Sequence, residues 1–294
     1  MSAVTPIQRA AGHPLAAIAS LLFVPGNRPE RFAKALGAGA GAVIVDWEDA
    51  VAPDDKVLVR GHFVQAVEAL PPADRARLMV RINAPGTPWH DDDVAVLPDL
   101  VKLGITSVVL PKAEDPADID RVAKAMGPAG AIWPIIESAA GLDNAKAVAE
   151  SPQVLRLLFG DLDFQADLGL SCGPDGPELY APRMAVVLAA RLAGLPAPFD
   201  GVSSETKDMA VVQAQAERAL RGGFGGKLCI HPAQVAAVHT AFAPTPEKLA
   251  WAHAVLDGFA KHKGGVFNLN GKMVDAPVAK LAEQIVQRAR GLGL

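Results

Sequence analysis

The sequence predicts an α/β fold, a (β/α)8 TIM barrel followed by a small C-terminal helical lid. Three observations support this prediction. Eight short apolar runs follow one another along the chain, and longer stretches with a helical pattern separate most of them. The 294 residues, half of them hydrophobic, suffice for one large core with an appendage. Strands joined by helical crossovers form parallel sheets, and eight of them favour a closed barrel over an open doubly wound sheet.

The predicted strands are apolar runs that end in glycine, proline or polar residues, as interior parallel strands do. In chain order they are 17–24, 41–47, 77–83, 106–112, 131–138, 155–161, 196–202 and 226–232. Helical patterns occupy 29–38, 53–69, 116–126, 139–150, 181–193 and 206–221. The barrel is therefore expected to span residues 1–244. Residues 245–294 form the lid, with a helix at 251–260, a glycine-rich turn at 261–273 and a last helix from Pro277.

Composition excludes several classes of partner. The formal net charge is −4 and no run of Lys and Arg is interleaved with aromatics, so nucleic acid is not an expected partner. Cys172 and Cys229 are the only cysteines, which indicates neither a disulfide framework nor a structural zinc site and favours a reducing, cytoplasmic location.

The apolar run 15–24 after Arg9 ends in Pro-Gly-Asn-Arg rather than in a signal-peptide cleavage site, and no run reaches membrane-spanning length.

Polar residues directly after the strands mark the expected site, because barrel enzymes use the carboxyl ends of their strands. They are Asp46, Trp47, Glu48, Asp49, Arg81, Asn83, Lys112, Glu137, Ser138, Asp161 and Asp163. Carboxylates on neighbouring strands repel each other unless a cation joins them or one keeps its proton. Glu137 and Asp163 follow adjacent strands, and with no cysteine or histidine pair nearby they suit Mg²⁺ completed by water and substrate oxygens. The alternative is that one of them caps the following helix.

Arg81 is the one arginine in this set, and it is expected to face the barrel mouth or the barrel interior. An unpaired arginine there is costly, and a substrate carboxylate or an enolate oxygen would relieve that cost. Pairing with Glu48 or Asp49 is the other interpretation, and both can hold at once.

Two weaker signals lie near the last strand. The string "GGFGGK" at 222–227 lacks the Ser or Thr of a Walker loop and is better explained as a tight turn than as a phosphate cradle. His231 is a candidate ligand or base, although its place before Pro232 also fits a turn.

Together these motifs resemble the HpcH/HpaI aldolase/citrate lyase superfamily, which includes the citrate lyase beta subunit, malyl-CoA lyases and citramalyl-CoA lyases. The resemblance rests on the blocks "LLFVPGNRPERFAKAL", "VIVDWEDAV", "VRIN", "VVLPKAE", "IIESAAGL", "FGDLDFQADLG", "GKLCIHPAQV" and "NGKMVDAPV", which occur in family order. It implies a carbon–carbon lyase that uses Mg²⁺. Such an enzyme cleaves, or forms, a 3-hydroxyacyl-CoA thioester such as citramalyl-, malyl- or citryl-CoA, and its other product is a 2-oxo acid.

The resemblance also assigns residues. The family's magnesium ligands fall on Glu137 and Asp163, and the arginine that contacts the substrate carbonyl or carboxylate falls on Arg81. Asp275 matches the acid/base in the lid, which a neighbouring subunit supplies, so a homotrimer or homohexamer is implied. The substrate is further expected to contact Glu48, Asp49, Gly160, Asp161 and Leu162, while Asp161 and Asp167 shape the loop around Asp163.

Two departures and two alternatives remain. Ala19 stands where the family often has arginine, which predicts the loss of a positive charge near the site, and Trp47 stands where leucine is usual. Both put the substrate or CoA contacts in question. The alternatives are a metal-dependent pyruvate-type aldolase acting on free hydroxy-oxo acids, against which "GKMVD" argues, and a non-catalytic acyl-CoA binding protein.

Overall fold

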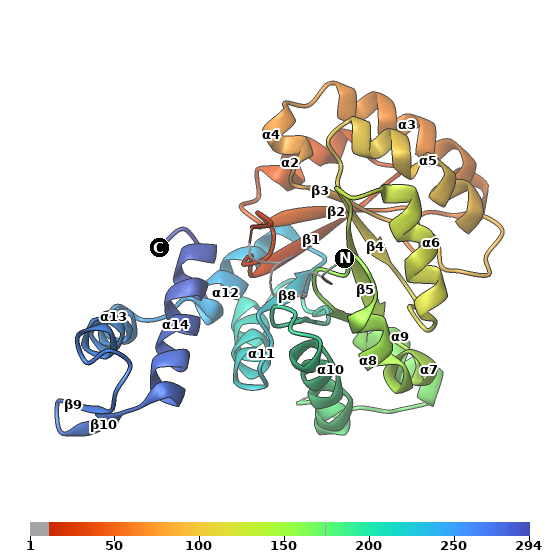
Figure 1. Ribbon diagram of the computed structural model, residues 1–294. Helices are drawn as coiled ribbons and strands as arrows, with labels where there is room; N and C mark the ends of the chain where they lie inside the picture. Colours follow the sequence, from red (N-terminus) through yellow and green to blue (C-terminus); the bar gives the residue numbers. More distant parts are fainter. Residues whose placement is uncertain (1–11, 174) are drawn as a thin grey trace.

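A closed barrel of eight parallel strands forms the centre of the structure, a computed structural model that describes residues 12–173 and 175–294 (Figure 1). The strands follow one another around the barrel in chain order, and β1 pairs with β8 to close it. They are β1 (Ser20–Pro25), β2 (Ala42–Asp46), β3 (Leu78–Arg81), β4 (Ser107–Leu110), β5 (Ala131–Ile136), β6 (Leu158–Phe159), β7 (Phe199–Asp200) and β8 (Gly226–Cys229). The predicted fold class is confirmed. Residues 1–11 and 174 of the predicted barrel segment lie outside the described residues.

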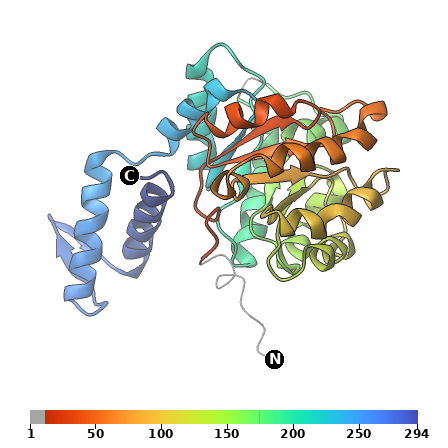
Figure 2. The ribbon, with the colours of Figure 1, turned by 90° about the horizontal axis from the view of Figure 1, so that it is seen from above.

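Helices connect the strands and cover the outside of the barrel (Figures 1 and 2). The α-helices of this part are α2 (Phe32–Leu36), α3 (Lys56–Glu68), α4 (Pro72–Arg75), α5 (His90–Lys102), α6 (Pro116–Met126), α7 (Ala139–Asp143), α8 (Ala145–Glu150), α9 (Asp161–Leu168), α10 (Tyr180–Leu192), α11 (Met209–Arg221) and α12 (Pro232–Phe242). Single 3-10 turns precede three of them, at η1 (Pro29–Arg31), η2 (Pro53–Asp55) and η3 (Pro177–Leu179). The helix α5 was not predicted, because three aspartates in its first turn and Pro98 inside it interrupt the apolar pattern.

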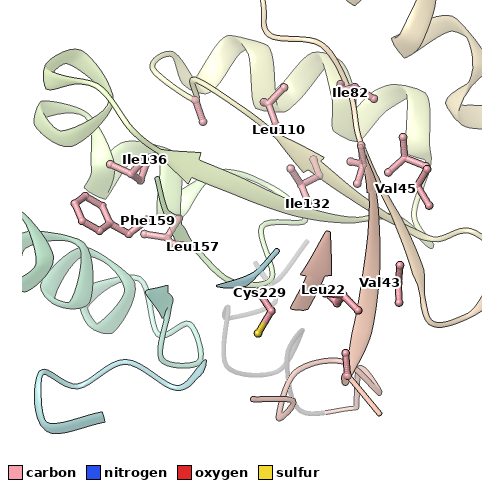
Figure 3. Packing of buried hydrophobic residues seen from close by; sticks show 14 of the residues in the cluster. Leu22, Val43, Val45, Ile82, Leu110, Ile132, Ile136, Leu157, Phe159 and Cys229 are labelled. Carbon is pink, nitrogen blue, oxygen red and sulfur yellow. The ribbon is translucent and has the colours of Figure 1, made fainter. Parts of the chain in front are cut away.

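Two apolar layers hold the barrel together, since successive strand residues point to opposite faces. Leu22, Val43 and Val45 point outward and pack under the helices, in the layer that Figure 3 shows. Leu21 and Ile44 point inward and fill the interior with residues from the other strands. A filled interior leaves the ends of the barrel as the places where a ligand can bind.

Arg156 fills the amino-terminal end of the barrel. Its side chain is almost fully buried, and its guanidinium donates to the backbone oxygens of Ile18 at 2.7 Å and Ala197 at 2.6 and 2.8 Å. The same group lies over the ring of Phe199, 4.0 Å from its centroid. Burial lowers the pKa of Arg156 to about 9. Arg156 thereby joins the segment before β1 to the segment before β7.

We expect Arg156→Ala to lower the free energy of unfolding by about 3–5 kcal/mol, because it opens a cavity and leaves buried carbonyls without donors. Arg121, whose side chain is 50% exposed and pairs with Asp91, is the control. Arg121→Ala is expected to cost less than about 1 kcal/mol. Urea unfolding of both variants measures the difference, and equal losses would contradict this role of Arg156.

The segment after α12 forms a separate arm. It comprises α13 (Pro246–Lys261), β9 (Phe267–Leu269), β10 (Lys272–Val274) and α14 (Ala276–Gly291). It has its own apolar cluster, with Val255, Val274 and Ile285 among its members, and it projects to one side of the barrel (Figure 2). The predicted glycine-rich turn is in fact largely a β-hairpin. Asn270 and Gly271 both adopt positive φ at its tip, which is typical of a two-residue Asn-Gly hairpin turn.

Among the described residues, none of the helices combines the length and the apolar character that crossing a bilayer requires.

Candidate active site

A pocket of about 380 Å³ opens at the carboxyl ends of the strands. Its polar lining comprises Asp46, Asp49, Arg81, Glu137, Asp161 and Asp163, and its apolar walls include Phe23, Phe159, Leu162 and Leu228. A larger groove of about 790 Å³ lies on the outer surface between α10 and α11, and none of the predicted site residues lines it. The smaller pocket is the candidate site because the sequence-predicted chemistry converges there.

Glu137 follows β5 and is held in place by backbone. Its side chain is buried, and Oε1 accepts a hydrogen bond of 2.7 Å from the amide of Lys112. Lys112 adopts a φ of +46°, a conformation that costs a non-glycine residue free energy and that directs its N–H at this carboxylate. Gly160 makes room on the other side, since a Cβ there would overlap Oε2 of Glu137.

Asp163 lies in the first turn of α9, immediately after β6, and lines the same pocket as Glu137. Burial and, second, the charge of Asp163 raise the pKa of Glu137 to about 7. Two carboxylates that repel each other in a partly desolvated pocket fit a divalent cation that binds oxygen ligands. Among the described residues no three His, Cys, Asp or Glu side chains are grouped as a metal site, so water and substrate oxygens would supply the remaining ligands.

Neither Glu137 nor Asp163 caps the helix that follows its strand, so the capping alternative is wrong. Ser138, not Glu137, caps α7 by accepting from the amide of Gly141 at 3.0 Å. The N-cap of α9 is Gly160, and no side-chain hydrogen bond caps that helix. Asp167 accepts from the amide of Ala139 at 2.7 Å and so ties α9 to the segment that follows Glu137.

Arg81 lies at the end of β3. Its guanidinium is buried, and three carboxylates lie against one side of it. Its Nε and Nη2 donate to the two oxygens of Asp46 at 2.8 and 2.6 Å, and Nη1 lies 3.0 Å from Glu48 and 3.3 Å from Asp49. The pairing with Glu48 and Asp49 that the sequence left open is therefore present. Asp46 was missed as the main partner, although Asp46 and Arg81 are register neighbours on β2 and β3. The guanidinium still borders the pocket, where it can meet a substrate oxygen.

Glu48 and Asp49 differ in their exposure. The side chain of Asp49 is 59% exposed and lines the pocket, whereas that of Glu48 is 8% exposed and lies against Arg81 outside the pocket lining. Burial raises the pKa of Glu48 to about 8, against the opposing charge of Arg81. Glu48 thus contacts the arginine rather than the pocket itself.

The segment of Gly160, Asp161 and Leu162, which is expected to contact the substrate, lines the pocket, and Asp161 also faces a buried cluster that was not predicted. Burial raises its pKa, and one of its oxygens lies 3.9 Å from Nη2 of Arg183. Arg183 in turn donates to Asp200 at 2.9 Å. These contacts anchor the first turn of α9, which carries Asp163.

Lys227, the last residue of the string "GGFGGK", belongs to the same buried cluster. It is 1% exposed, and its ammonium donates to the carbonyl of Gly201 at 2.7 Å inside the barrel. Gly223 supplies a positive φ in the turn before β8. The turn interpretation is confirmed. His231 is the N-cap of α12, where its side chain accepts from the amide of Ala233 at 3.2 Å.

The two departures from the family pattern do not affect the pocket as expected. Ala19 is buried just before β1, at the amino end of the barrel, so the expectation of a charge lost near the site is wrong. Trp47 is fully buried in the outer layer, with its ring 5.4 Å from that of Phe63 and outside the pocket lining.

Asp275 is the N-cap of α14 in the arm, where its Oδ1 accepts from the amide of Val278 at 3.2 Å. It is partly buried and does not line the pocket of its own chain. The structure therefore brings together Arg81, Glu137 and Asp163 but not Asp275.

The raised pKa of Glu137 predicts that Mg²⁺ binding depends on pH. Because this pKa rises from 4.5 to about 7, a proton occupies the carboxylate in mildly acidic solution and competes with the cation. Without metal, this group contributes stability that is fully present below pH 4.5 and is lost as the pH rises through about 7.

We therefore expect the increase in Tm caused by saturating Mg²⁺ to be larger at about pH 8 than at about pH 6. Thermal unfolding with and without Mg²⁺ measures it. Glu137→Gln should show little increase at either pH, and an equal increase for the wild-type protein at both would contradict the prediction.

Comparisons with known proteins point to one family. A family model described as HpcH/HpaI aldolase/citrate lyase matches residues 19–232, and one described as a C-C bond lyase of the TIM-barrel fold matches residues 199–294. A citrate lyase subunit beta-like protein of Deinococcus radiodurans is 37% identical over 283 residues, covering 93% of this chain and 98% of that protein.

Two further relatives are each 32% identical to the chain. One is a (3S)-malyl-CoA thioesterase of Cereibacter sphaeroides, aligned over 276 residues that cover 93% of this chain and 95% of that protein. The other is the human mitochondrial citramalyl-CoA lyase, aligned over 297 residues that cover 93% of this chain and 86% of that protein. The solved structure of CitE from Mycobacterium tuberculosis in complex with magnesium, acetoacetate and coenzyme A has a TM-score of 0.77 and 35% identity, covering 94% of this chain and 99% of that chain.

Proposed function

The chain belongs to the HpcH/HpaI aldolase/citrate lyase family, and on this premise we propose that it is a Mg²⁺-dependent lyase of 3-hydroxyacyl-CoA thioesters. Citramalyl-, malyl- or citryl-CoA is the proposed substrate class, and the products are an acyl-CoA such as acetyl-CoA and a 2-oxo acid. The observation that carries the proposal is the convergence of Glu137, Asp163 and Arg81 on one pocket. The names of the relatives and the magnesium and coenzyme A in the solved CitE complex support it.

Cleavage breaks the bond between the α and β carbons. The 3-hydroxyl loses its proton to solvent water and becomes a carbonyl, and the electron pair of the broken bond leaves as a thioester enolate. A bound Mg²⁺ supplies Lewis-acid stabilisation of negative charge on substrate oxygens. Glu137 and Asp163 would hold the cation. Arg81, oriented by Asp46, donates hydrogen bonds to the oxygen that gains charge. The departing enolate then needs a proton at its α carbon.

Asp275 is proposed to exchange that proton, and a neighbouring subunit is proposed to supply it within a homotrimer or homohexamer. Its position on the arm, outside the pocket lining of its own chain, supports an intersubunit role.

Co-expressed Asp275→Asn and Glu137→Gln subunits test this role, each variant being inactive alone. Random assembly should regenerate a complete site at about one interface in four. Recovery of lyase activity near that fraction is expected. No recovery in confirmed mixed oligomers would contradict a site shared between subunits.

The function itself is tested by incubating the protein with malyl-, citramalyl- and citryl-CoA, with Mg²⁺ or with a chelator. A lyase releases acetyl-CoA and a 2-oxo acid only with the metal. Hydrolysis, in contrast, releases free CoA and the intact hydroxy acid. A pyruvate-type aldolase would split free hydroxy-oxo acids instead, and a binding protein would split nothing. Cleavage of free hydroxy-oxo acids, or no cleavage of any of these compounds, would overturn the proposal.

A further inference from the structure

A buried lysine lies beneath the loop that carries Glu48 and Asp49. We propose that Lys56 is a positioning residue for Arg81, an inference that rests on the proposed function of the pocket. Lys56 is 6% exposed and is absent from the pocket lining, so it acts through other groups. The contacts of its ammonium show which groups these are.

The ammonium of Lys56 joins the ends of two neighbouring strands. Its Nζ donates to the backbone oxygens of Trp47 at 3.1 Å and Glu48 at 2.8 Å, just after β2. It also donates to Oδ1 of Asn83 at 2.5 Å, just after β3. An ammonium has three hydrogens, and these three acceptors use all of them.

Asn83 gives Lys56 a fixed point of attachment. Its backbone amide and its side-chain amide both donate to Oδ2 of Asp93, at 2.8 and 2.7 Å. Asp93 is fully buried, and its other oxygen accepts from Arg60 at 2.7 Å. Because Asn83 is two residues beyond Arg81, the loop after β2 is attached to the same strand end that carries the arginine.

Asp46 holds the same loop from the other side. Its two oxygens accept from the amides of Glu48 at 2.9 Å and Ala50 at 3.1 Å, while they also receive Arg81. With the carbonyls of Trp47 and Glu48 turned toward Lys56, the Glu48 and Asp49 side chains face Nη1 of Arg81. Loss of Lys56 would free this loop and let the guanidinium change its orientation.

The test is a double-mutant cycle between Lys56→Met and Arg81→Lys, with Lys102→Met as the control. Lys102 is an exposed lysine on α5 whose ammonium lies 2.7 Å from the exposed Asp99. Misplacement of a catalytic group by about 1 Å costs on the order of 10²-fold in rate. We expect Lys56→Met to lower kcat about 10- to 100-fold with a smaller change in KM, and to leave the Kd for Mg²⁺ at its wild-type value. Lys102→Met should change none of these values.

In the Arg81→Lys background, Lys56→Met should lower kcat little further, because the effect of Lys56 on kcat passes through the arginine. Multiplicative losses in the cycle, or a wild-type rate in Lys56→Met, would overturn the proposal. Lys56→Gln, which keeps a donor, replaces Lys56→Met if thermal unfolding shows that the latter does not fold.

The same cycle is measured on the Kd of oxaloacetate in the presence of Mg²⁺, which needs no turnover. Lys56→Met is expected to weaken this binding in the wild-type background and not in the Arg81→Lys background. A wild-type protein that cleaves no thioester would contradict the proposed function, and the binding cycle would still decide the role of Lys56.

Discussion

Replacement of Arg81 by alanine is expected to lower kcat/KM for the thioester substrate by at least about 10²-fold, because it removes donors from the oxygen that gains charge. The structure adds a second effect. Arg81 neutralises the buried carboxylate of Asp46 and lies against the buried Glu48, and removal of one partner of a buried ion pair costs about 3–5 kcal/mol of stability. Steady-state kinetics and urea unfolding measure the two effects.

The two effects can be separated with Arg81→Met combined with Asp46→Asn, which removes the buried charge together with its partner. This double variant should recover part of the stability and none of the activity. Recovery of both would show that Arg81 serves the fold alone, and wild-type rates in Arg81→Ala would exclude it from the reaction.

Replacement of Glu137 by glutamine is expected to weaken Mg²⁺ binding by about two orders of magnitude and to lower turnover at least as much. Glutamine keeps an oxygen that can accept from the amide of Lys112, so the fold around the site should persist. Isothermal calorimetry with Mg²⁺ is the direct measurement.

Asp49→Asn is the matched control for Glu137→Gln. Asp49 also carries a charge in the pocket lining, but it contacts Arg81. The Mg²⁺ affinity of the Asp49→Asn variant is expected to remain close to that of the wild-type protein. If Glu137→Gln bound Mg²⁺ with unchanged affinity, Glu137 would not be a ligand.

The barrel could be predicted from the sequence because its strands are continuous apolar runs with both faces buried. Strand ends were less predictable. The run 155–161 was expected to be one strand, yet only Leu158–Phe159 pairs as β6, and Asp161 already begins α9. The hairpin of the arm was missed, although Asn270-Gly271 is a known signal for it.

The central residues of the pocket could also be predicted, since parallel strands place their carboxyl ends on one face. The supporting contacts could not. Lys56 lies in a stretch whose pattern is that of a surface helix, and only the three-dimensional structure shows that its ammonium is buried. The family pattern alone did not show that Ala19, which precedes β1, lies at the end of the barrel opposite the pocket.

The anchor of Glu137 is a peptide N–H and not a side chain, which affects how the site tolerates genetic change. Any residue except proline carries that N–H, and the side chain of Lys112 is exposed. Codon changes at 112 therefore preserve the bond provided that the residue accepts the unusual φ, for which glycine and asparagine are the best suited. Substitution of Lys112 by such a residue is therefore expected to leave the orientation of the Glu137 carboxylate unchanged.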